Sequence, residues 1–334
     1  MRKKKWLDIA TSLLHSRAMA VYTPVSEQEL RDLLSLYNIG TLQSFEGIEA
    51  GVSNTNYFVT TEQARFVLTL FEPHRVREED IPFYLGYAIT LEESGVPCPR
   101  TMTTKTGQSL SRVCGRPAAI FSVLNGDEGH VSKLNPSMCE NAGAVLARMH
   151  LAAAKITAHA TNHFGRARWD LWVATIGSRM DQIATGLYAL TKGELLRIEN
   201  ELPGNLPSGA IHGDYFPDNV FFEKNNVTGV IDFHFVCTDA FVYDLAIAIN
   251  AWSFDANNQF QADRMDAMVR GYNSVRPLSK SEDADLPVLL RAAALRFLLS
   301  RIEEKLNWNP DNLMKPHDPM VFEKRLRHFG GGTA

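Results

Sequence analysis

The stretch that most constrains this chain runs from Ile211 to Phe233. It places three polar side chains, Asp214, Asn219 and Asp232, between apolar segments. Asn219 lies five positions after Asp214 (219 − 214 = 5), and Asp232 lies thirteen positions after Asn219 (232 − 219 = 13). Apolar runs interrupted by turn residues predict short buried strands, here a small hairpin that sets the distance between the polar groups. The fold must therefore bring two carboxylates and one amide together.

This spacing is typical of the catalytic loop and the metal-binding strand of a phosphotransferase. In that chemistry Asp214 accepts the proton of an acceptor hydroxyl. Asn219 and Asp232 carry oxygen ligands suited to the hard cation Mg²⁺. An isolated His-Gly-Asp is more often an ordinary turn, but the two partners at these spacings argue against that alternative.

Composition limits the class of protein. The chain has 334 residues, of which 45% are hydrophobic and 22% charged, so we expect a folded protein of two compact units around a shared cleft. The net charge of −4 offers no basic surface, and no nucleic-acid partner is expected. The cysteines form no CxxC pair, which favours free thiols in a reducing compartment over a zinc site or a disulfide framework.

The amino-terminal residues need separate treatment. Arg2–Lys5 is basic, and the apolar run that follows is interrupted by Asp8 and His15. A secretory signal requires an unbroken apolar core, so residues 1–18 are predicted to be a disordered extension. No window approaches the length of a membrane span, and we expect no membrane partner and a cytoplasmic location.

Residues 19–124 are predicted to form a small amino-terminal lobe that binds nucleotide. Runs rich in apolar, β-branched and aromatic residues predict antiparallel strands over Thr41–Ala50, Tyr57–Thr61 and Arg65–Phe71. The apolar pattern of Glu78–Ser94, which stops at a glycine, predicts a helix.

Two segments of this lobe are candidates for nucleotide contacts. The first is the turn between the first two strands, whose backbone N–H groups would face a triphosphate. Alone it could close any hairpin, and only its position ahead of the catalytic loop favours a nucleotide. The second is the end of the buried strand Ala118–Leu124, a hinge where the backbone of Ser122 and Leu124 can pair with an adenine edge. The turn consists of Gly51, Val52, Ser53 and Asn54.

Residues 125–330 are predicted to form a larger, mostly helical lobe that holds the catalytic hairpin and binds the acceptor. The mixture of an antiparallel sheet and segregated helices makes the chain an α+β protein. The helices are expected at Asn135–Ala153, Asp170–Asn200, Tyr243–Ala251, Asn258–Tyr272 and Ser279–Asn307.

Several stretches around the catalytic block are distinctive. They are Gly51–Val59, Phe66–Glu72, Phe216–Phe222, Ile231–Phe235 and Tyr243–Trp252. The block His212-Gly213-Asp214 with Asn219 and Asp232 resembles the aminoglycoside phosphotransferase and choline kinase-like superfamily, whose members are related to protein kinases. Together with the flanking stretches it is similar to the bacterial homoserine kinases of this fold, which serve threonine biosynthesis. The likeness covers nearly the whole chain.

The resemblance implies a protein-kinase-like two-lobe fold and ATP-dependent phosphorylation of the L-homoserine hydroxyl, giving O-phospho-L-homoserine. ATP and L-homoserine would be the substrates and Mg²⁺ the metal cofactor. Asp214 would be the base, and Asn219 and Asp232 would hold the metal. Within the same fold the alternative is another small hydroxyl acceptor, such as choline, a sugar or an aminoglycoside.

One position departs from the kinase pattern. Many of these enzymes carry a Lys or Arg on the third strand that contacts the α- and β-phosphates, whereas this chain has Thr69. Arg65 or Arg75 could substitute, although each fits a solvated surface charge. The lost cation motivates a second hypothesis, a non-catalytic nucleotide-binding pseudokinase, and the retained catalytic and metal residues argue against it.

An amino-acid acceptor needs one partner for its carboxylate and one for its ammonium group. Arg296 and Arg301 lie in an otherwise apolar helix, where an unpaired charge is costly, so they are candidates for the carboxylate. Salt bridges to Glu303 or Asp255 are the competing interpretation. Asp255 is also the candidate for the ammonium, and His234 lines the acceptor pocket or simply packs.

Three further residues are expected to act structurally. His212 would brace the catalytic loop through backbone hydrogen bonds. Asp244 opens an apolar helix and would cap it or support the loop. Trp252 would pack rather than take part in chemistry.

Overall fold

The chain divides into two compact units in this computed structural model. The first unit is Met1–Glu78 with Met102–Ser122, and the second is Glu79–Thr101 with Val123–Ala334. The predicted extension 1–18 lies outside the described residues. The structure describes residues 22–48, 54–73, 76–202, 204–309 and 315–331.

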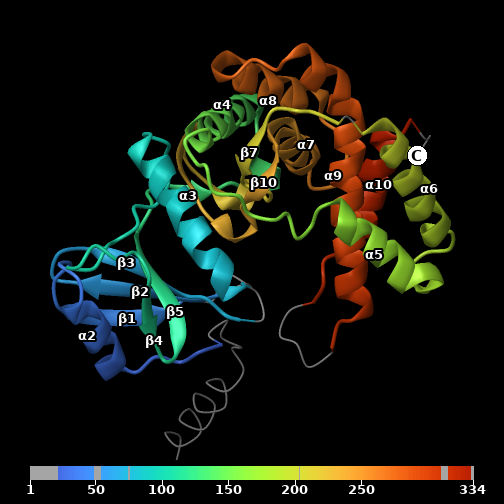
Figure 1. The fold of residues 1–334 in the computed structure, drawn as a ribbon. Helices are drawn as coiled ribbons and strands as arrows, with labels where there is room; N and C mark the ends of the chain where they lie inside the picture. Colours follow the sequence, from blue (N-terminus) through green and yellow to red (C-terminus); the bar gives the residue numbers. More distant parts are fainter. Residues whose placement is uncertain (1–21, 49–53, 74–75, 203, 310–314, 332–334) are drawn as a thin grey trace, which may run out of the picture. The chain divides into compact units, whose positions relative to one another are not determined.

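The first unit is built on an antiparallel sheet. In its described residues the sheet has five strands in the order β1-β2-β3-β5-β4 (Figure 1). β2 and β3 pair from Thr55↔Leu70 to Thr60↔Arg65, which confirms the predicted succession of strands. The strands are β1 (Leu42–Gly47), β2 (Thr55–Thr61), β3 (Arg65–Leu70), β4 (Ser111–Val113) and β5 (Arg116–Ser122).

One helix, α2 (Glu27–Ser35), covers the apolar face of this sheet. Ser26 begins it with a capping box, in which Ser26 and Glu29 each accept a hydrogen bond from the other's backbone N–H. The leucines of the helix then lie on its buried side, spaced as a helical period requires. The core they form with the sheet includes Leu30, Leu33, Leu34, Val59, Leu68 and Ile120.

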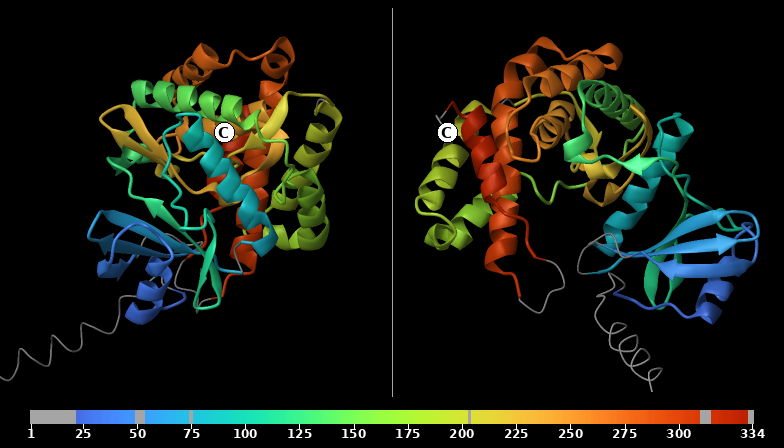
Figure 2. Two further views of the ribbon diagram at one scale, coloured as in Figure 1. Left: turned by 60° about the vertical axis from the view of Figure 1, so that its left-hand side comes forward. Right: turned by 180° about the vertical axis from the view of Figure 1, so that it is seen from behind.

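The second unit is mostly helical. Its helices are α3 (Ile81–Glu93), α4 (Pro136–Ala153), α5 (Arg166–Ile176), α6 (Leu187–Glu201), α7 (Phe241–Trp252), α8 (Ala262–Val275), α9 (Lys280–Leu306) and α10 (Met320–Phe329). Its strands are β6 (Asp127–Glu128), β7 (Ser208–Ile211), β8 (Val220–Glu223), β9 (Asn226–Val230) and β10 (Cys237–Ala240). The long helix α9 runs beside α6 and α10, as the two views of Figure 2 show.

The core of the second unit is centred on α7, in which every residue is buried. α7 packs against α9 on one side and contacts α4 and α8. β7 and β10 pair antiparallel, with Ile211 opposite Cys237. The catalytic segment therefore leaves the core at Ile211 and returns to it at Cys237, so both of its ends are fixed.

Three elements differ from the sequence prediction. The segment Asp170–Asn200, predicted to be helical throughout, is divided between α5 and α6, and the break contains two glycines with positive φ, Gly177 and Gly186. The helix α3, predicted within the amino-terminal lobe 19–124, belongs to the second unit. The cause is packing: α3 contacts α4, and the ring of Tyr87 meets that of Phe233 at 5.5 Å. The helix α10 was not predicted, and it packs along α9.

Two glycines allow α4 and α8 to approach closely. A Cβ atom added at Gly143 of α4 would lie 2.2 Å from the backbone oxygen of Met268. One added at Gly271 of α8 would lie 1.9 Å from the backbone oxygen of Glu140. Because backbone atoms cannot give way cheaply, any side chain at either position forces the helices apart.

We therefore expect Gly271→Ala to lower the free energy of unfolding by about 3 kcal/mol, the upper part of the range for overpacked cores. The matched control is Gly193→Ala in α6, an exposed helical site where an added Cβ meets nothing within 4 Å. That change should raise the free energy of unfolding by about 0.5–1 kcal/mol. Urea denaturation of both variants measures the difference, and equal stability of the two would contradict the close approach.

Candidate active site

The hairpin of β8 and β9 brings the predicted metal ligands together. Val220 and Val230 pair across it, and the Ile231 N–H donates to the Asn219 carbonyl oxygen at 2.9 Å. Asp232 is the next residue, so its side chain leaves the hairpin beside Asn219. The predicted thirteen-residue spacing is thus the length of a two-stranded hairpin.

Asn219 also reaches back to the predicted base. Its Nδ2 donates to the Asp214 carbonyl oxygen at 2.9 Å and faces Asp214 Oδ2 at 3.4 Å. Because Nδ2 is the donor in this contact, the other atom of the Asn219 amide, Oδ1, is the one that can bind a cation. With the carboxylate of Asp232 this is an oxygen donor set that fits Mg²⁺.

The backbone of Asp232 is left-handed, with φ of +69°. Among non-glycine residues Asp adopts this region more readily than most, and it turns the side chain out of the strand direction. His234 contacts the carboxylate, its Nδ1 meeting Asp232 Oδ1. Burial alone would raise the pKa of Asp232, but the neighbouring His234 more than offsets it, and the pKa lies below the ordinary value. The carboxylate is therefore ionised, as a metal ligand must be.

The pKa of Asp214 is shifted upward, in the opposite direction to that of Asp232. Burial raises its pKa, and the guanidinium of Arg296 opposes that rise while Asp232 adds to it. Arg296 Nη1 lies 3.9 Å from Asp214 Oδ1. A raised pKa makes the carboxylate a better proton acceptor, which is what a general base requires.

Arg296 is held by aromatic rings as well as by this charge. Its guanidinium lies 3.8 Å from the ring centroid of Phe297, 4.9 Å from that of Phe164 and 5.6 Å from that of Phe235. Such contacts stabilise a buried cation without neutralising it. Arg296 therefore faces Asp214, and Glu303, the partner that the competing interpretation of the sequence suggests, pairs instead with Arg168 at 3.1 Å.

A buried carboxylate of α7 supports the loop by accepting hydrogen bonds from its backbone. Asp244, fully buried in α7, accepts the N–H of His212 at 2.8 Å and that of Gly213 at 2.9 Å. Gly213 has φ of +74°, and a Cβ there would lie 2.7 Å from the Phe235 backbone oxygen. The loop can follow this path only with glycine, and the expected support of the loop by Asp244 is confirmed.

His150, which sequence reasoning missed, completes the support. Its Nε2 lies 3.0 Å from Asp244 Oδ2 and its Nδ1 2.7 Å from the Tyr272 hydroxyl, which accepts a bond of 3.0 Å from Arg276. Burial lowers the pKa of His150. For Asp244 burial would raise the pKa, but the hydrogen bond from His150 more than offsets it and the pKa is lowered. A neutral imidazole therefore donates to an ionised carboxylate.

His212 braces the loop through backbone atoms, as predicted. Its Nδ1 accepts the N–H of Asp214 at 3.2 Å, and its Nε2 lies 3.0 Å from the Ile231 carbonyl oxygen. The first contact requires the proton on Nε2, which then donates to Ile231. One neutral ring thus ties the base to the residue before Asp232. Trp252 packs as expected, and its Nε1 donates to the Tyr215 carbonyl oxygen at 2.9 Å.

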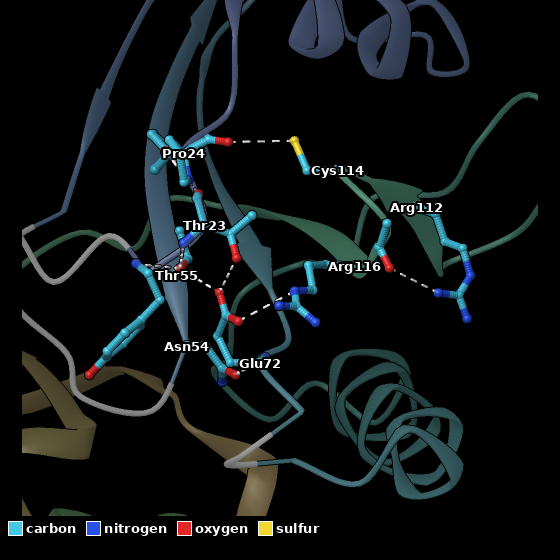
Figure 3. A network of polar contacts seen from close by, with 11 residues as sticks. Thr23, Pro24, Asn54, Thr55, Glu72, Arg112, Cys114 and Arg116 are labelled. Atoms are coloured by element: carbon cyan, nitrogen blue, oxygen red, sulfur yellow. Dashed lines mark hydrogen bonds and ion pairs between the residues drawn. The ribbon is translucent and has the colours of Figure 1, made fainter.

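In the first unit a polar network surrounds the first residues of β2, the strand that follows the predicted nucleotide turn. Glu72, only 2% exposed, accepts from the hydroxyls of Thr23 and Thr55, both at 2.7 Å, and lies 3.5 Å from Arg116 (Figure 3). Asn54 Oδ1 accepts the Glu72 N–H at 3.2 Å. The strand that follows the turn is therefore fixed at its first residues. Gly51, Val52 and Ser53 lie outside the described residues.

The third strand has no basic residue at Thr69, whose hydroxyl donates to Asn56 Oδ1 at 2.7 Å. Of the two suggested substitutes, Arg75 lies outside the described residues. Arg65 pairs with Glu46 at 2.6 Å and lies 3.8 Å from the Phe58 ring centroid. Both partners of that pair are exposed, so the structure places Arg65 on the surface.

The remaining predicted residues lie in different surroundings. Asp255 closes a turn, since its Oδ1 accepts the N–H groups of Asn257 and Gln259, both at 2.9 Å. Ser122 ends β5 in the first unit, and Leu124 belongs to the second, where it lies against Gly229 of β9. Their proposed contacts with adenine stay predictions.

Comparison with known proteins identifies the class. The phosphotransferase enzyme family matches residues 44–278. Similar solved structures include an amicoumacin kinase in complex with AMP-PNP and Ca²⁺ (TM-score 0.70, 14% identity, covering 92% of this chain and 94% of that one). Another is a microcompartment-associated aminopropanol kinase (TM-score 0.59, 21% identity, 92% and 95%). The chain belongs to the phosphotransferase enzyme family, and the predicted kinase-like fold is confirmed.

The sequence relatives narrow the class. A homoserine kinase of Methylobacterium radiotolerans is 44% identical over 308 residues, 92% of this chain and 95% of the relative. One from Rhodopseudomonas palustris is 43% identical over 312 residues, 92% and 94%. Within its family the chain groups with these homoserine kinases, as the resemblance of the sequence indicated.

The Arg296 charge generates a prediction about pH. In its predicted role as the base, Asp214 accepts a proton only when it is ionised, so kcat/KM should fall as the pH drops through its raised pKa. Arg296→Gln removes the opposing positive charge, the pKa of Asp214 rises further, and the acidic limb moves to higher pH. Arg296→Lys keeps a charge and should leave the limb closer to that of the wild type. Identical acidic limbs in the wild type and the Gln variant would contradict the contact.

Proposed function

We propose that this chain is an ATP-dependent homoserine kinase, which converts L-homoserine to O-phospho-L-homoserine in threonine biosynthesis. The observation that carries the choice of acceptor is the 44% identity to a homoserine kinase over 92% of the chain. The arrangement of Asp214, Asn219 and Asp232 supports the reaction type. Choline, a sugar or an aminoglycoside remains the alternative acceptor for the same fold.

The loop geometry supports Asp214 as the general base. Its carboxylate would accept the proton of the acceptor hydroxyl as the hydroxyl oxygen attacks the γ-phosphorus of ATP. The bond from that phosphorus to the β–γ bridging oxygen breaks, and ADP leaves with the oxygen. His212, Asp244 and Asn219 keep the carboxylate in place, so little reorganisation is needed at the moment of transfer.

Asn219 and Asp232 would hold the metal. Oδ1 of Asn219 is the amide atom left by its bond to Asp214, and Asp232 is ionised. Bound Mg²⁺ would supply charge neutralisation on the phosphates. His234, which contacts Asp232, would then orient this ligand rather than the acceptor.

ATP is proposed to lie under the turn that contains Gly51, Val52, Ser53 and Asn54, with its adenine against the hinge at Ser122 and Leu124. The Glu72 network supports the first part, because it fixes the strand that leaves the turn. In the described part of the chain no helix is both long and apolar enough to cross a membrane. The four cysteines are free thiols, which suits a cytoplasmic location.

The decisive experiment is an acceptor panel. Purified protein with Mg-ATP is expected to convert L-homoserine to a product with the mass of O-phosphohomoserine, and Asp214→Asn should lower kcat by about 10²- to 10⁴-fold. No phosphohomoserine, together with phosphorylation of choline, a sugar or an aminoglycoside, would sink the acceptor assignment. Equal turnover by the wild type and Asp214→Asn would instead indicate a nucleotide-binding pseudokinase.

A further inference from the structure

A pocket of about 280 Å³ lies beside the catalytic loop, entirely within the second unit. Phe216 and Asp218 of the loop line it together with Ala251 of α7. Arg301 of α9 and Arg325 of α10 supply its positive charge. Apart from these charged groups the wall is largely apolar, which is the composition of a small-ligand site with a few polar groups that fix orientation.

Arg301 lines this pocket and contacts an aromatic ring there. Among the residues that the structure describes, it makes no ion pair and no hydrogen bond. Its guanidinium lies 4.4 Å from the ring centroid of Phe322. Burial lowers its pKa to about 10, which Asp214 partly opposes, so the group is still charged at neutral pH. An unpaired, partly buried cation is costly, and an anionic ligand removes that cost.

Arg325 lines the same pocket but is fully engaged. Its Nε donates to Asn258 Oδ1 at 2.8 Å and its Nη1 to the Asn250 carbonyl oxygen at 2.5 Å. The Phe322 ring contacts both arginines and lies 4.7 Å from the Arg325 guanidinium. Arg325 therefore fixes the ring on which Arg301 lies and adds positive charge to the pocket.

Asp218 supplies a negative charge to the pocket that the two arginines line. Among the described residues its carboxylate makes no ion pair and no hydrogen bond to another residue, and its one backbone hydrogen bond lies within Asp218 itself. It lines the same pocket as Arg301. One cation and one anion facing a small apolar space are complementary to a zwitterion.

The other candidates for these roles are occupied. Arg296 faces Asp214 and is surrounded by aromatic rings. Both oxygens of Asp255 are used in its turn, where Oδ2 accepts from Gln261 Nε2 at 3.2 Å. Of the two arginines predicted to bind the acceptor carboxylate, only Arg301 is available. For the ammonium group, Asp218 is available and Asp255 is not.

We propose that this pocket binds the amino-acid end of the acceptor, with Arg301 on the α-carboxylate and Asp218 on the α-ammonium group. The inference rests on the proposed function and adds the groups that select an α-amino acid. Phe216 would cover the methylene carbons. The hydroxyl would then point along the loop toward Asp214, whose charge already acts on Arg301.

The test compares three hydroxyl acceptors: L-homoserine, 3-amino-1-propanol, which lacks the carboxylate, and 4-hydroxybutyrate, which lacks the ammonium group. The wild type should prefer L-homoserine to both. Arg301→Gln should lower kcat/KM for L-homoserine by about 10- to 100-fold and narrow the preference over 3-amino-1-propanol. Asp218→Asn should narrow the preference over 4-hydroxybutyrate.

The matched control is Arg270→Gln, which removes an exposed arginine of α8 that pairs with Glu140. It should leave all three acceptors unchanged. L-homoserine should raise the melting temperature of the wild type and of the control, but not that of Arg301→Gln. Because Arg301→Gln loses only the contact of Arg301 with the Phe322 ring, this variant should melt within a few degrees of the wild type without ligand.

The failures can be told apart. If the wild type makes phosphohomoserine but Arg301→Gln keeps the preference ratios of Arg270→Gln, the pocket assignment is overturned and the proposed function stands. An equal loss toward L-homoserine and 3-amino-1-propanol also overturns the assignment, because the carboxylate would not be what Arg301 contacts. A wild type that makes no phosphohomoserine overturns both.

Discussion

The catalytic loop depends on one buried carboxylate. Asp244 accepts two consecutive backbone N–H groups, those of His212 and Gly213, at a point where the chain passes through a left-handed glycine. An ionised carboxylate inside a protein is tolerated only when its oxygens are hydrogen-bonded, and the loop supplies two of the donors. The loop conformation and the charge state of Asp244 therefore stabilise each other.

The third donor connects this carboxylate to the rest of the unit. A chain of hydrogen bonds runs from Arg276 through the Tyr272 hydroxyl to His150 and ends on Asp244, so α4, α7 and α8 meet at one acceptor. The close packing of α4 and α8 through their glycines keeps His150 near Tyr272. His212 connects the loop to the residue before Asp232, because its ring is hydrogen-bonded to the Ile231 carbonyl oxygen. Asp214, Asn219 and Asp232 thus share one rigid support.

The sequence reveals those features whose interacting residues lie close together along the chain, and it does not reveal those whose residues lie far apart. Three helices begin with a capping residue that the local sequence makes recognisable. The structure has a side-chain cap at each of these residues, Ser26, Asn135 and Ser279. The hairpin that joins Asn219 to Asp232 is also local, so its spacing is readable. The bond from His150 to Tyr272 spans 122 positions, and no local pattern marks it. Sequence reasoning also missed α10, although Phe322 and Leu326 have helical spacing, and with it missed Arg325.

The most direct measurement is the steady-state kinetics of Asp244→Asn. The amide keeps one acceptor oxygen but presents N–H groups to the backbone N–H of the loop, so the loop must shift while the ATP and acceptor surfaces stay intact. We predict that kcat falls on the order of 100-fold, as for a catalytic group misplaced by about 1 Å, while both KM values change only a few-fold. An unchanged kcat in the folded variant would contradict the dependence of the catalytic loop on this buried carboxylate.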